Sequence, residues 1–416
     1  MTIALLTLGC KLNFAETATY ERGLLAAGLE VVPADGPADA YLINTCSVTA
    51  TADAKSRNLI RKVRRLNPDA VIVVAGCSAE LRRSEIERIE GVSRVFSAQE
   101  KGLVVPETLA LLGLPAPAQM APQAVFPAYS AAESRTRAFL KVQDGCNNYC
   151  AYCTVPYARG ESRNIPIAEC VRNAERIAAE GVKEIVLTGV NTGDFGRTTG
   201  ESFLSLLQAL NDVGGIRRYR ISSIEPNLLT EEIVDWIASG TKFQPHFHIP
   251  LQTGSDELLA RMGRRYDTAL FADRLEMIRR RMEHPGGPKV FFGIDVMVGL
   301  PGETDALFRQ TFDFIGRIRP AFIHVFPYSR RPGTPAASMS GQVPEAVKKQ
   351  RVAVLEELCR SLHEDFREQN RGVREQVLFE STCRGGMMEG YTGNYIRITR
   401  PYDPALVNTL VDIVID

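Results

Sequence analysis

The sequence lacks several features that would assign it to a simple class. Its 416 residues include one tryptophan and five histidines, and 49 basic residues are matched by 49 acidic ones. Because the net charge is zero, the chain is not of the class that binds nucleic acid through an overall positive charge. Any contact with nucleic acid must come from local basic patches. No apolar run approaches the roughly 18 residues that a membrane span needs. We expect no membrane partner and a cytoplasmic location.

Cysteine is also scarce. Nine cysteines in a chain of this length are too few for a disulfide scaffold. Their number is odd and their spacing is uneven. In a cytosolic protein, such cysteines are more often metal ligands or catalytic groups than disulfides.

The pattern along the chain predicts an α/β protein with three parts. Residues 1–112 alternate strand and helix, as in an open parallel α/β sheet. Four prolines in residues 113–134 indicate a linker. The alternation resumes over residues 135–370 and predicts a partial or complete βα barrel of TIM-like type. Residues 371–416 carry short strands with glycine turns, which favours a small β-barrel. The barrel strands are predicted at Ala138–Gln143, Glu184–Thr188, Tyr219–Ser222, His246–Pro250, Val290–Val298 and Phe322–Phe326.

One cysteine group has the spacing C-x3-C-x2-C and follows the first predicted barrel strand. Cys146, Cys150 and Cys153 lie in the segment DGCNNYCAYC. Structural zinc normally takes four ligands, and no fourth cysteine or histidine lies close by in the sequence. Three thiolates would leave one iron of a 4Fe–4S cluster open for a substrate or cofactor. A structural zinc loop is the alternative.

A second group becomes visible only from its local contexts. Cys10, Cys46 and Cys77 each follow directly after a predicted strand. The carboxyl ends of parallel strands line one crevice in an open α/β sheet. Three thiols at one edge would make a second three-ligand cluster site, although each cysteine alone is more often a buried apolar residue.

The C-x3-C-x2-C motif resembles that of the radical S-adenosylmethionine superfamily. The two cysteine groups and the small C-terminal β-domain together resemble the methylthiotransferases, which carry a C-terminal TRAM domain. The resemblance extends to the segments HIPLQTGSDELLARMGRRY and HVFPYSRRPGTPAA. It implies S-adenosyl-L-methionine and two 4Fe–4S clusters, one on each cysteine group. It also implies that the two clusters face each other across one cavity.

The chain resembles one branch of this family in particular. TLGCKLN is similar to the MtaB branch, whereas the MiaB branch tends to carry GCQMN and the RimO branch GCPKN. DGCNN and LTGVNTGDFG also resemble MtaB sequences. This implies methylthiolation at C2 of N6-threonylcarbamoyladenosine, next to the tRNA anticodon. Isopentenyladenosine in tRNA and a ribosomal-protein aspartate are the alternative substrates within the family. The implied partners are the tRNA anticodon loop, an external electron donor and a sulfur donor of unknown identity.

The resemblance also implies residues that contact the cofactor. Tyr152 stands where the family places an aromatic side chain near the adenine, and the other candidates follow barrel strands. These are Gly189, Ser223, Glu225, Gln252 and Arg265. Arg264 shares with Arg265 the ability to pair with a carboxylate, of the cofactor or of the substrate. The alternatives are an ordinary strand-end turn for Gly189, and a helix cap and a surface charge for Ser223 and Glu225.

Two histidines alternate in one predicted strand, and an acid lies in another. We expect His246 and His248 to be polar interior residues, and metal ligation is the alternative. Asp295 lies in the apolar segment FFGIDVMVGL, where a buried acid requires hydrogen bonds. It belongs either to the site or to the satisfied barrel interior.

RNA contact is predicted from one helix. Arg57, Arg61, Arg64 and Arg65 share a face of the helix expected at about residues 52–66, and an ordinary solvated face is the alternative. The C-terminal part carries five basic and six acidic residues, so we expect little electrostatic affinity from it. Its Tyr391, Tyr395 and Tyr402 could stack on bases.

Two functions outside the family compete with this interpretation. A zinc-stabilised RNA-binding protein without catalysis would be colourless and free of labile sulfide. An electron-transfer iron–sulfur protein would hold clusters but would not cleave the cofactor. The barrel and the three-ligand spacing argue against both.

Overall fold

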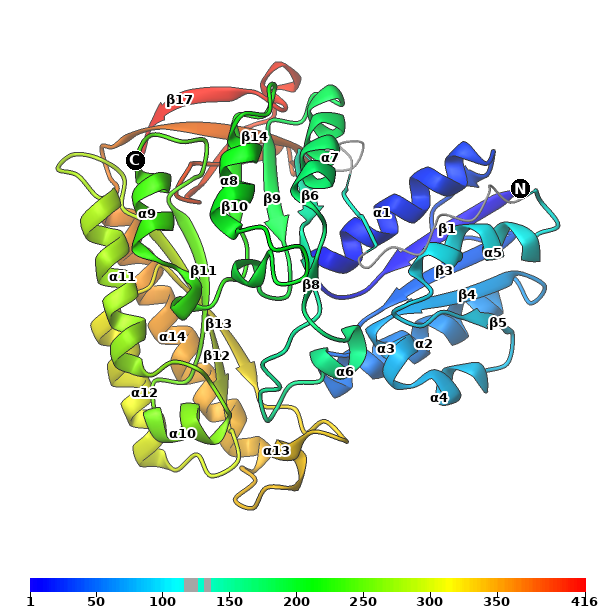
Figure 1. Cartoon of the computed structure of the whole chain (residues 1–416), viewed down its shortest axis with the longest axis horizontal. Coiled ribbons are helices and arrows are strands. Elements are labelled where there is room, and N and C mark those ends of the chain that lie inside the picture. Colours follow the sequence, from blue (N-terminus) through cyan, green and yellow to red (C-terminus); the bar gives the residue numbers. More distant parts are fainter. Residues whose placement is uncertain (116–125, 131–135) are drawn as a thin grey trace.

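The computed structural model describes residues 1–115, 126–130 and 136–416. Most of the predicted linker, residues 113–134, therefore lies outside the described residues. The described part has α/β layers with parallel sheets and a separate antiparallel sheet at the C-terminus, which confirms the predicted fold class (Figure 1). No helix in it is long and apolar enough to cross a membrane.

The N-terminal sheet is parallel, with strand order β2-β1-β3-β4-β5. Its central strands are apolar on both faces because helices cover both sides, as the sequence VIVVAG of β4 shows. The strand order reverses between β1 and β3, so the crevice for a ligand lies at the carboxyl ends of these strands. The elements are β1 Thr2–Thr7, α1 Lys11–Ala26, β2 Glu30–Val31, β3 Ala40–Thr45, α2 Ala50–Leu66, β4 Val71–Gly76, α3 Cys77–Leu81, α4 Arg83–Glu87, β5 Val92–Val95 and α5 Val104–Leu111.

Six parallel strands form an incomplete barrel. They make two three-stranded sheets, β10-β9-β6 and β11-β12-β13, and an isolated bridge between Tyr219 and Phe243 adjoins them. The first and last strands, β6 and β13, do not pair, so the barrel is open on one side, where α1 packs against β6. The strands are β6 Arg137–Lys141, β9 Glu184–Thr188, β10 Arg218–Ile221, β11 His246–Gln252, β12 Phe291–Val298 and β13 Phe322–Pro327.

Helices cover the outside of this barrel and supply its largest apolar core. They are amphipathic, with Leu206 and Leu210 of α8 and Phe314 of α12 fully or nearly fully buried. The barrel helices are α6 Val155–Arg159, α7 Ile167–Ala179, α8 Phe203–Asn211, α9 Glu231–Ala238, α10 Asp256–Arg261, α11 Thr268–Met282, α12 Asp305–Ile318, α13 Pro335–Ser338 and α14 Glu345–Gln369; a short pair, β7 Gln143–Asp144 and β8 Arg163–Asn164, lies near the first cysteine loop.

The C-terminal sheet is antiparallel, with order β16-β15-β14-β17. It docks on the amino ends of the barrel strands. The Arg218 guanidinium donates to the carbonyl oxygens of Tyr391 and Gln376, and Arg220 donates to those of Thr392 and Gly393. Its strands are β14 Arg374–Arg384, β15 Met387–Tyr391, β16 Arg397–Pro401 and β17 Leu410–Val414.

Candidate active site between two cysteine groups

Cys10, Cys46 and Cys77 lie at the carboxyl ends of the parallel strands β1, β3 and β4. Cys10 precedes α1, Cys46 follows β3, and Cys77 begins α3. A Cβ atom added to Gly9 would lie 2.8 Å from the Cys46 Sγ, so only glycine lets the Cys10 loop approach Cys46 this closely. Burial, with smaller contributions from the neighbouring Cys77 and Cys10, raises the pKa of the Cys46 thiol to about 11. The three predicted cluster cysteines are therefore neighbours at one sheet edge.

A buried network of charged side chains lies beside this cysteine group. It joins the two large parts of the chain, which are the N-terminal α/β part and the barrel part. Lys101 and Lys141 lie 2.8 Å from the Glu16 carboxylate, and Arg159 lies 2.9 Å from that of Asp144. Burial alone would raise the pKa of the Glu16 carboxyl, but Lys101, Lys141 and Arg159 outweigh it and hold this pKa well below its usual range.

The buried part of the network has three cations against two carboxylates, and the half-buried Arg163 adds a fourth cation 3.8 Å from Asp144, so positive charge is left over. Arg159 is close enough to Cys77 and Cys10 for their thiolates to raise its pKa. A buried excess cation is costly unless an anion faces it. A set of three thiolates that binds an iron–sulfur cluster supplies such an anion, so the residues present fit a cluster at this edge.

Cys146, Cys150 and Cys153 line a cavity of about 330 Å³ at the carboxyl ends of the barrel strands. The backbone N–H groups of Asn148 and Val155 each donate to a cysteine sulfur, Cys146 Sγ and Cys153 Sγ, at 3.4 Å. Arg264 donates to Cys150 Sγ at 3.1 Å. Hydrogen bonds to sulfur are a feature of iron–sulfur sites. Burial raises the pKa of Cys153 to about 12, so this thiol stays protonated near neutral pH unless a metal binds it.

Four of the residues that were predicted to contact the cofactor line the same cavity. They are Tyr152, Ser223, Glu225 and Gln252. Gln252 has a φ of +71°, which is strained for an L-residue and is typical of binding sites. Gly189 does not line the cavity: a Cβ atom there would lie 2.9 Å from Gln143 Oε1. Its two successors, Val190 and Asn191, line the cavity instead, and both donate their N–H groups to Gln143.

The two neighbouring arginines have different positions. Arg264 lines the cavity, pairs with Glu225 at 2.7 Å and donates to the Tyr152 hydroxyl at 3.3 Å. Arg265, the residue chosen from the sequence, is exposed and donates to the Asn147 carbonyl. The side chain that faces the cavity is therefore Arg264. The sequence alone does not predict which of the two arginines points inward, because this depends on the conformation of the turn after α10.

We predict a clear difference between variants at these two positions. Arg264→Gln leaves the buried Glu225 carboxylate without its cation and removes the donor to Cys150, so affinity for S-adenosylmethionine should fall about tenfold or more. Arg265→Gln is the matched control and should change the affinity less than twofold. Equilibrium binding of the cofactor to anaerobically purified protein measures both. Equal effects of the two variants would contradict the assignment of Arg264 to the cavity.

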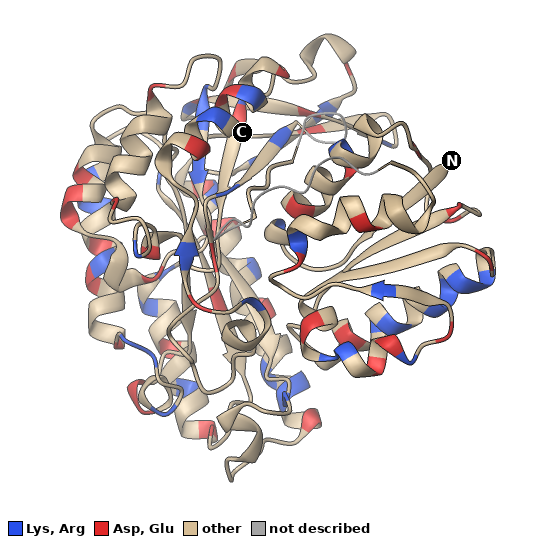
Figure 2. Ribbon diagram, turned by 45° about the vertical axis from the view of Figure 1, so that its right-hand side comes forward, with Lys and Arg blue, Asp and Glu red and all other residues tan. Residues whose placement is uncertain are grey.

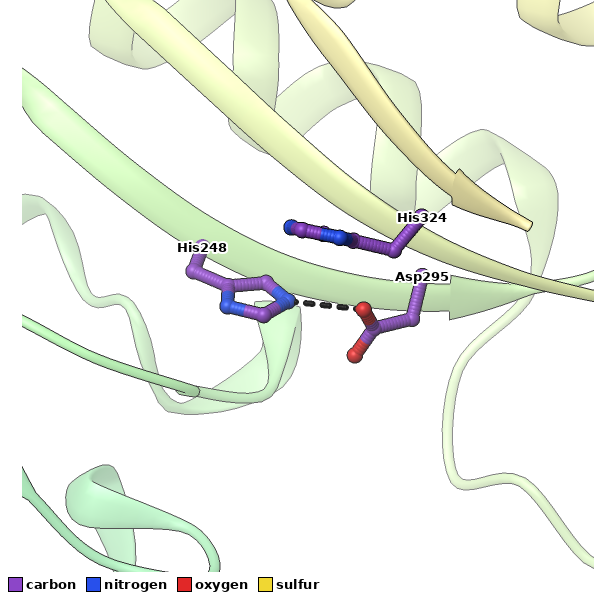
Figure 3. A group of neighbouring side chains, drawn as sticks. All are labelled: His248, Asp295 and His324. Atoms are coloured by element: carbon purple, nitrogen blue, oxygen red, sulfur yellow. Dashed lines mark hydrogen bonds and ion pairs between the residues drawn. The ribbon is translucent and has the colours of Figure 1, made fainter. Parts of the chain in front are cut away.

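A second cavity, of about 510 Å³, lies in the amino-terminal half of the barrel. His248 and His324 line this cavity, and Asp295 lies beside both of them (Figure 3). The His248 Nε2 atom is 2.9 Å from Asp295 Oδ1. Asp295 lines the first cavity and His248 lines the second, so this hydrogen-bonded pair lies between the two cavities. The bond to His248 supplies a partner for the half-buried Asp295 carboxylate.

The sequence did not identify His324 or Lys11 as candidate functional residues, although both line this second cavity. The position of Lys11 directly after Cys10 was the available signal. Solvent can enter the cavity and reach the Lys11 side chain, although protein atoms surround this side chain. This burial, together with Arg137 and Arg220, lowers the pKa of the Lys11 ammonium to about 8.

The distances between the thiols argue against a single zinc ion on either cysteine group. Within the described residues, the one group of three metal-ligating side chains whose ligand atoms all lie within 4.8 Å is His248, Asp295 and His324. Tetrahedral zinc with bonds of about 2.3 Å to sulfur would need thiols closer together than that limit.

The predicted RNA-contacting face lies on α2. Arg61 and Arg65 are exposed, whereas Arg57 and Arg64 lie 3.9 and 3.6 Å from Glu85 and Glu90. Figure 2 shows basic and acidic residues side by side in this part of the molecule. RNA contact through these arginines stays a prediction.

The three C-terminal tyrosines differ in their access to bases. Tyr391 stacks on Tyr395 with ring centroids 4.8 Å apart, and Tyr395 also packs against His246 and Phe291. These contacts leave Tyr395 half-buried, and stacking of a base on any of the three stays a prediction. Tyr402 is the exposed member of the three, at 38%.

Comparisons with known proteins agree with this geometry. Residues 140–315 match the model of the Radical SAM superfamily, and residues 2–97 match that of Uncharacterized protein family UPF0004. A solved radical S-adenosylmethionine methyltransferase, TsrM from Kitasatospora setae, superposes with a TM-score of 0.58 over 93% of this chain and 80% of that one. At 16% identity, this likeness shows the fold alone.

Curated relatives cover almost the whole chain. The threonylcarbamoyladenosine tRNA methylthiotransferase MtaB of Bacillus subtilis is 38% identical over 95% of this chain and 90% of its own length. The MtaB protein of Aquifex aeolicus is 34% identical over 96% and 97%. A tRNA-2-methylthio-N(6)-dimethylallyladenosine synthase from Carboxydothermus hydrogenoformans is 32% identical over 91% and 88%. This chain belongs to the tRNA methylthiotransferase family of radical S-adenosylmethionine enzymes.

Proposed function

We propose that this chain inserts a methylthio group at C2 of N6-threonylcarbamoyladenosine, next to the anticodon of tRNA. MtaB relatives of 33–38% identity support this substrate, as do the GCKLN and GDFG motifs. We further propose that it acts in the cytoplasm, where tRNA is found, with an external electron donor and a sulfur donor.

The observation that carries the proposal is the placement of two cysteine triplets at the carboxyl ends of two parallel sheets. Cys146, Cys150 and Cys153 line the first cavity, and Val48 and Thr49, which follow Cys46, line the same cavity from the N-terminal part. Ligand sites in both fold types lie at these strand ends. A reaction that uses both groups on one substrate requires this arrangement.

The residues of the chain have separate tasks in this account. Cys146, Cys150 and Cys153 would hold the radical 4Fe–4S cluster, and Cys10, Cys46 and Cys77 the auxiliary cluster. When bound, the radical cluster and S-adenosylmethionine supply the radical that abstracts hydrogen from the aromatic carbon, while the auxiliary cluster carries the sulfur.

The surrounding side chains bind and orient the cofactor. Arg264, held by Glu225 and Tyr152, presents a fixed cation to the cavity. Arg331 pairs with Asp53 across the two large parts and donates to Ser47, which lies next to Cys46. This buried contact fixes the loop after β3 against the barrel mouth.

The function is tested by turnover with defined RNA. Anaerobically reconstituted protein, S-adenosylmethionine, a low-potential reductant and a sulfide source are incubated with an anticodon stem-loop that carries N6-threonylcarbamoyladenosine. We expect its 2-methylthio form by mass spectrometry of nucleosides. A stem-loop with isopentenyladenosine is the matched control and should stay unchanged. Product from the control alone would assign the chain to the other tRNA substrate.

A further inference from the structure

The second cavity combines a ring of cations with the open side of the barrel. Its lining includes Lys11, Arg137 and Arg220 as well as His248, His324 and Tyr395. Lys11 enters from α1, which covers the gap beside β6, while the histidines come from the inner faces of β11 and β13. The cavity volume of about 510 Å³ lies within the range of small-molecule sites.

The arginines of this cavity already have partners. Arg220 lies 2.8 Å from Glu184 and donates to two backbone carbonyls, and it is fully buried. Arg137 pairs with Glu380 at 2.7 Å, and its guanidinium also donates to the Tyr395 hydroxyl. These contacts dock the C-terminal sheet, so neither arginine needs a ligand.

Lys11 differs from these arginines. Within the part of the chain that the structure describes, its ammonium makes no hydrogen bond or ion pair. It lines the cavity near Asp295, whose carboxylate His248 already holds. An ammonium with three unused donors beside a polar cavity is a binding group for an anion.

The charge around the cavity also favours an anion over a metal ion. His248, Asp295 and His324 could ligate a divalent cation, as their spacing allows. Such an ion would lie near the ammonium of Lys11, which repels it. A carboxylate ligand would instead be attracted by Lys11.

We propose that Lys11 binds the carboxylate of the threonylcarbamoyl substituent and thereby selects the acidic form of the substrate. This inference rests on the proposed function. The substituent leaves adenine at N6, on the same edge of the ring as C2, so its carboxylate lies near the reacting carbon. The Asp295–His248 pair lies between the two cavities in the same way, with the reaction on the Asp295 side and the substituent on the His248 side.

Binding of three stem-loop RNAs tests this proposal. They carry N6-threonylcarbamoyladenosine, the same nucleoside with its carboxylate converted to a primary amide, or unmodified adenosine. The anaerobically purified wild-type chain should bind the acid about 10- to 100-fold more tightly than the amide. Lys11→Gln should bind the two with equal affinity, while Lys11→Arg should keep the preference. Lys349→Gln, an exposed lysine on α14, is the matched control and should behave as wild type.

Several results would overturn the proposal. One is a Lys11→Gln variant that retains the wild-type preference for the acid, and another is a wild-type chain without any preference. A third is an equal loss of affinity for all three RNAs, or a loss of cluster iron, because either would mean that Lys11 acts on the structure around Cys10. Stoichiometric zinc that disappears in His324→Ala would assign the cavity to a metal instead. Turnover of isopentenyladenosine RNA by wild type would refute the proposed function independently of the Lys11 data.

Discussion

Replacing Cys146, Cys150 and Cys153 together by alanine should abolish the formation of 5′-deoxyadenosine and leave the auxiliary cluster intact. These thiols line the cavity with Tyr152 and Arg264, whereas the other three lie at a different sheet edge. Iron should fall from about eight to about four atoms per chain, since each cluster holds four. Iron and sulfide analysis, with chromatography of the cofactor products, measures both quantities.

The reciprocal variant and a single control make this experiment specific. Replacing Cys10, Cys46 and Cys77 should also remove about four irons, but cofactor cleavage should persist while methylthio transfer is lost. Cys383→Ala changes an exposed cysteine of β14 and should affect neither quantity. If the Cys146–Cys153 variant still produced 5′-deoxyadenosine, our assignment of the radical cluster would be wrong.

Glu16→Gln should cause the second large effect, a loss of about 3–5 kcal/mol of stability. Glu16 is fully buried and accepts from Lys101, Lys141 and Arg159, so the variant leaves three buried cations with the single carboxylate of Asp144. Urea unfolding at pH 7 measures the loss. Glu90→Gln, at an exposed side chain paired with Arg64, is the matched control and should stay within about 0.5 kcal/mol of wild type.

The pH dependence of the same comparison has a definite sign. Burial alone would raise the pKa values of Glu16 and Asp144, but the three cations lower both of them below their usual range in the folded chain. A carboxyl with a lowered folded pKa stabilises the protein above its unfolded pKa of about 4, and this contribution is lost as the pH falls further. The difference between wild type and Glu16→Gln should therefore shrink on acidification below about pH 4. A difference that grows there would contradict the network.

Most of the strand framework follows from hydrophobic patterning. The predicted strand Glu184–Thr188 coincides with β9, and the other barrel strands agree to within a few residues because each is an apolar run between turn signals. Asn13 is of a residue type that favours helix N-caps, but Cys10 precedes α1 instead. The buried Asn13 side chain donates to the carbonyls of Leu8 and Thr45.

The remaining errors come from contacts that a local pattern cannot encode. Glycine in this region is typical of turns, but Gly390 lies inside β15, where a Cβ atom would collide with Val377 and Phe379 of the neighbouring strand. Lys11 reaches the barrel interior only because α1 packs against β6. The positions of Cys10, Cys46 and Cys77 could be predicted from the sequence because each of these residues directly follows a strand. Contacts between side chains of the N-terminal part and side chains of the barrel could not be predicted.

Mass spectrometry of tRNA nucleosides tests the central claim most directly. Cells that lack their own enzyme for this modification are compared with and without this chain, with the Cys146–Cys153 alanine variant as control. We predict that the 2-methylthio form of N6-threonylcarbamoyladenosine appears with the wild-type chain alone. Its absence, with the unmethylthiolated nucleoside present and the wild-type chain holding both clusters, would contradict the account.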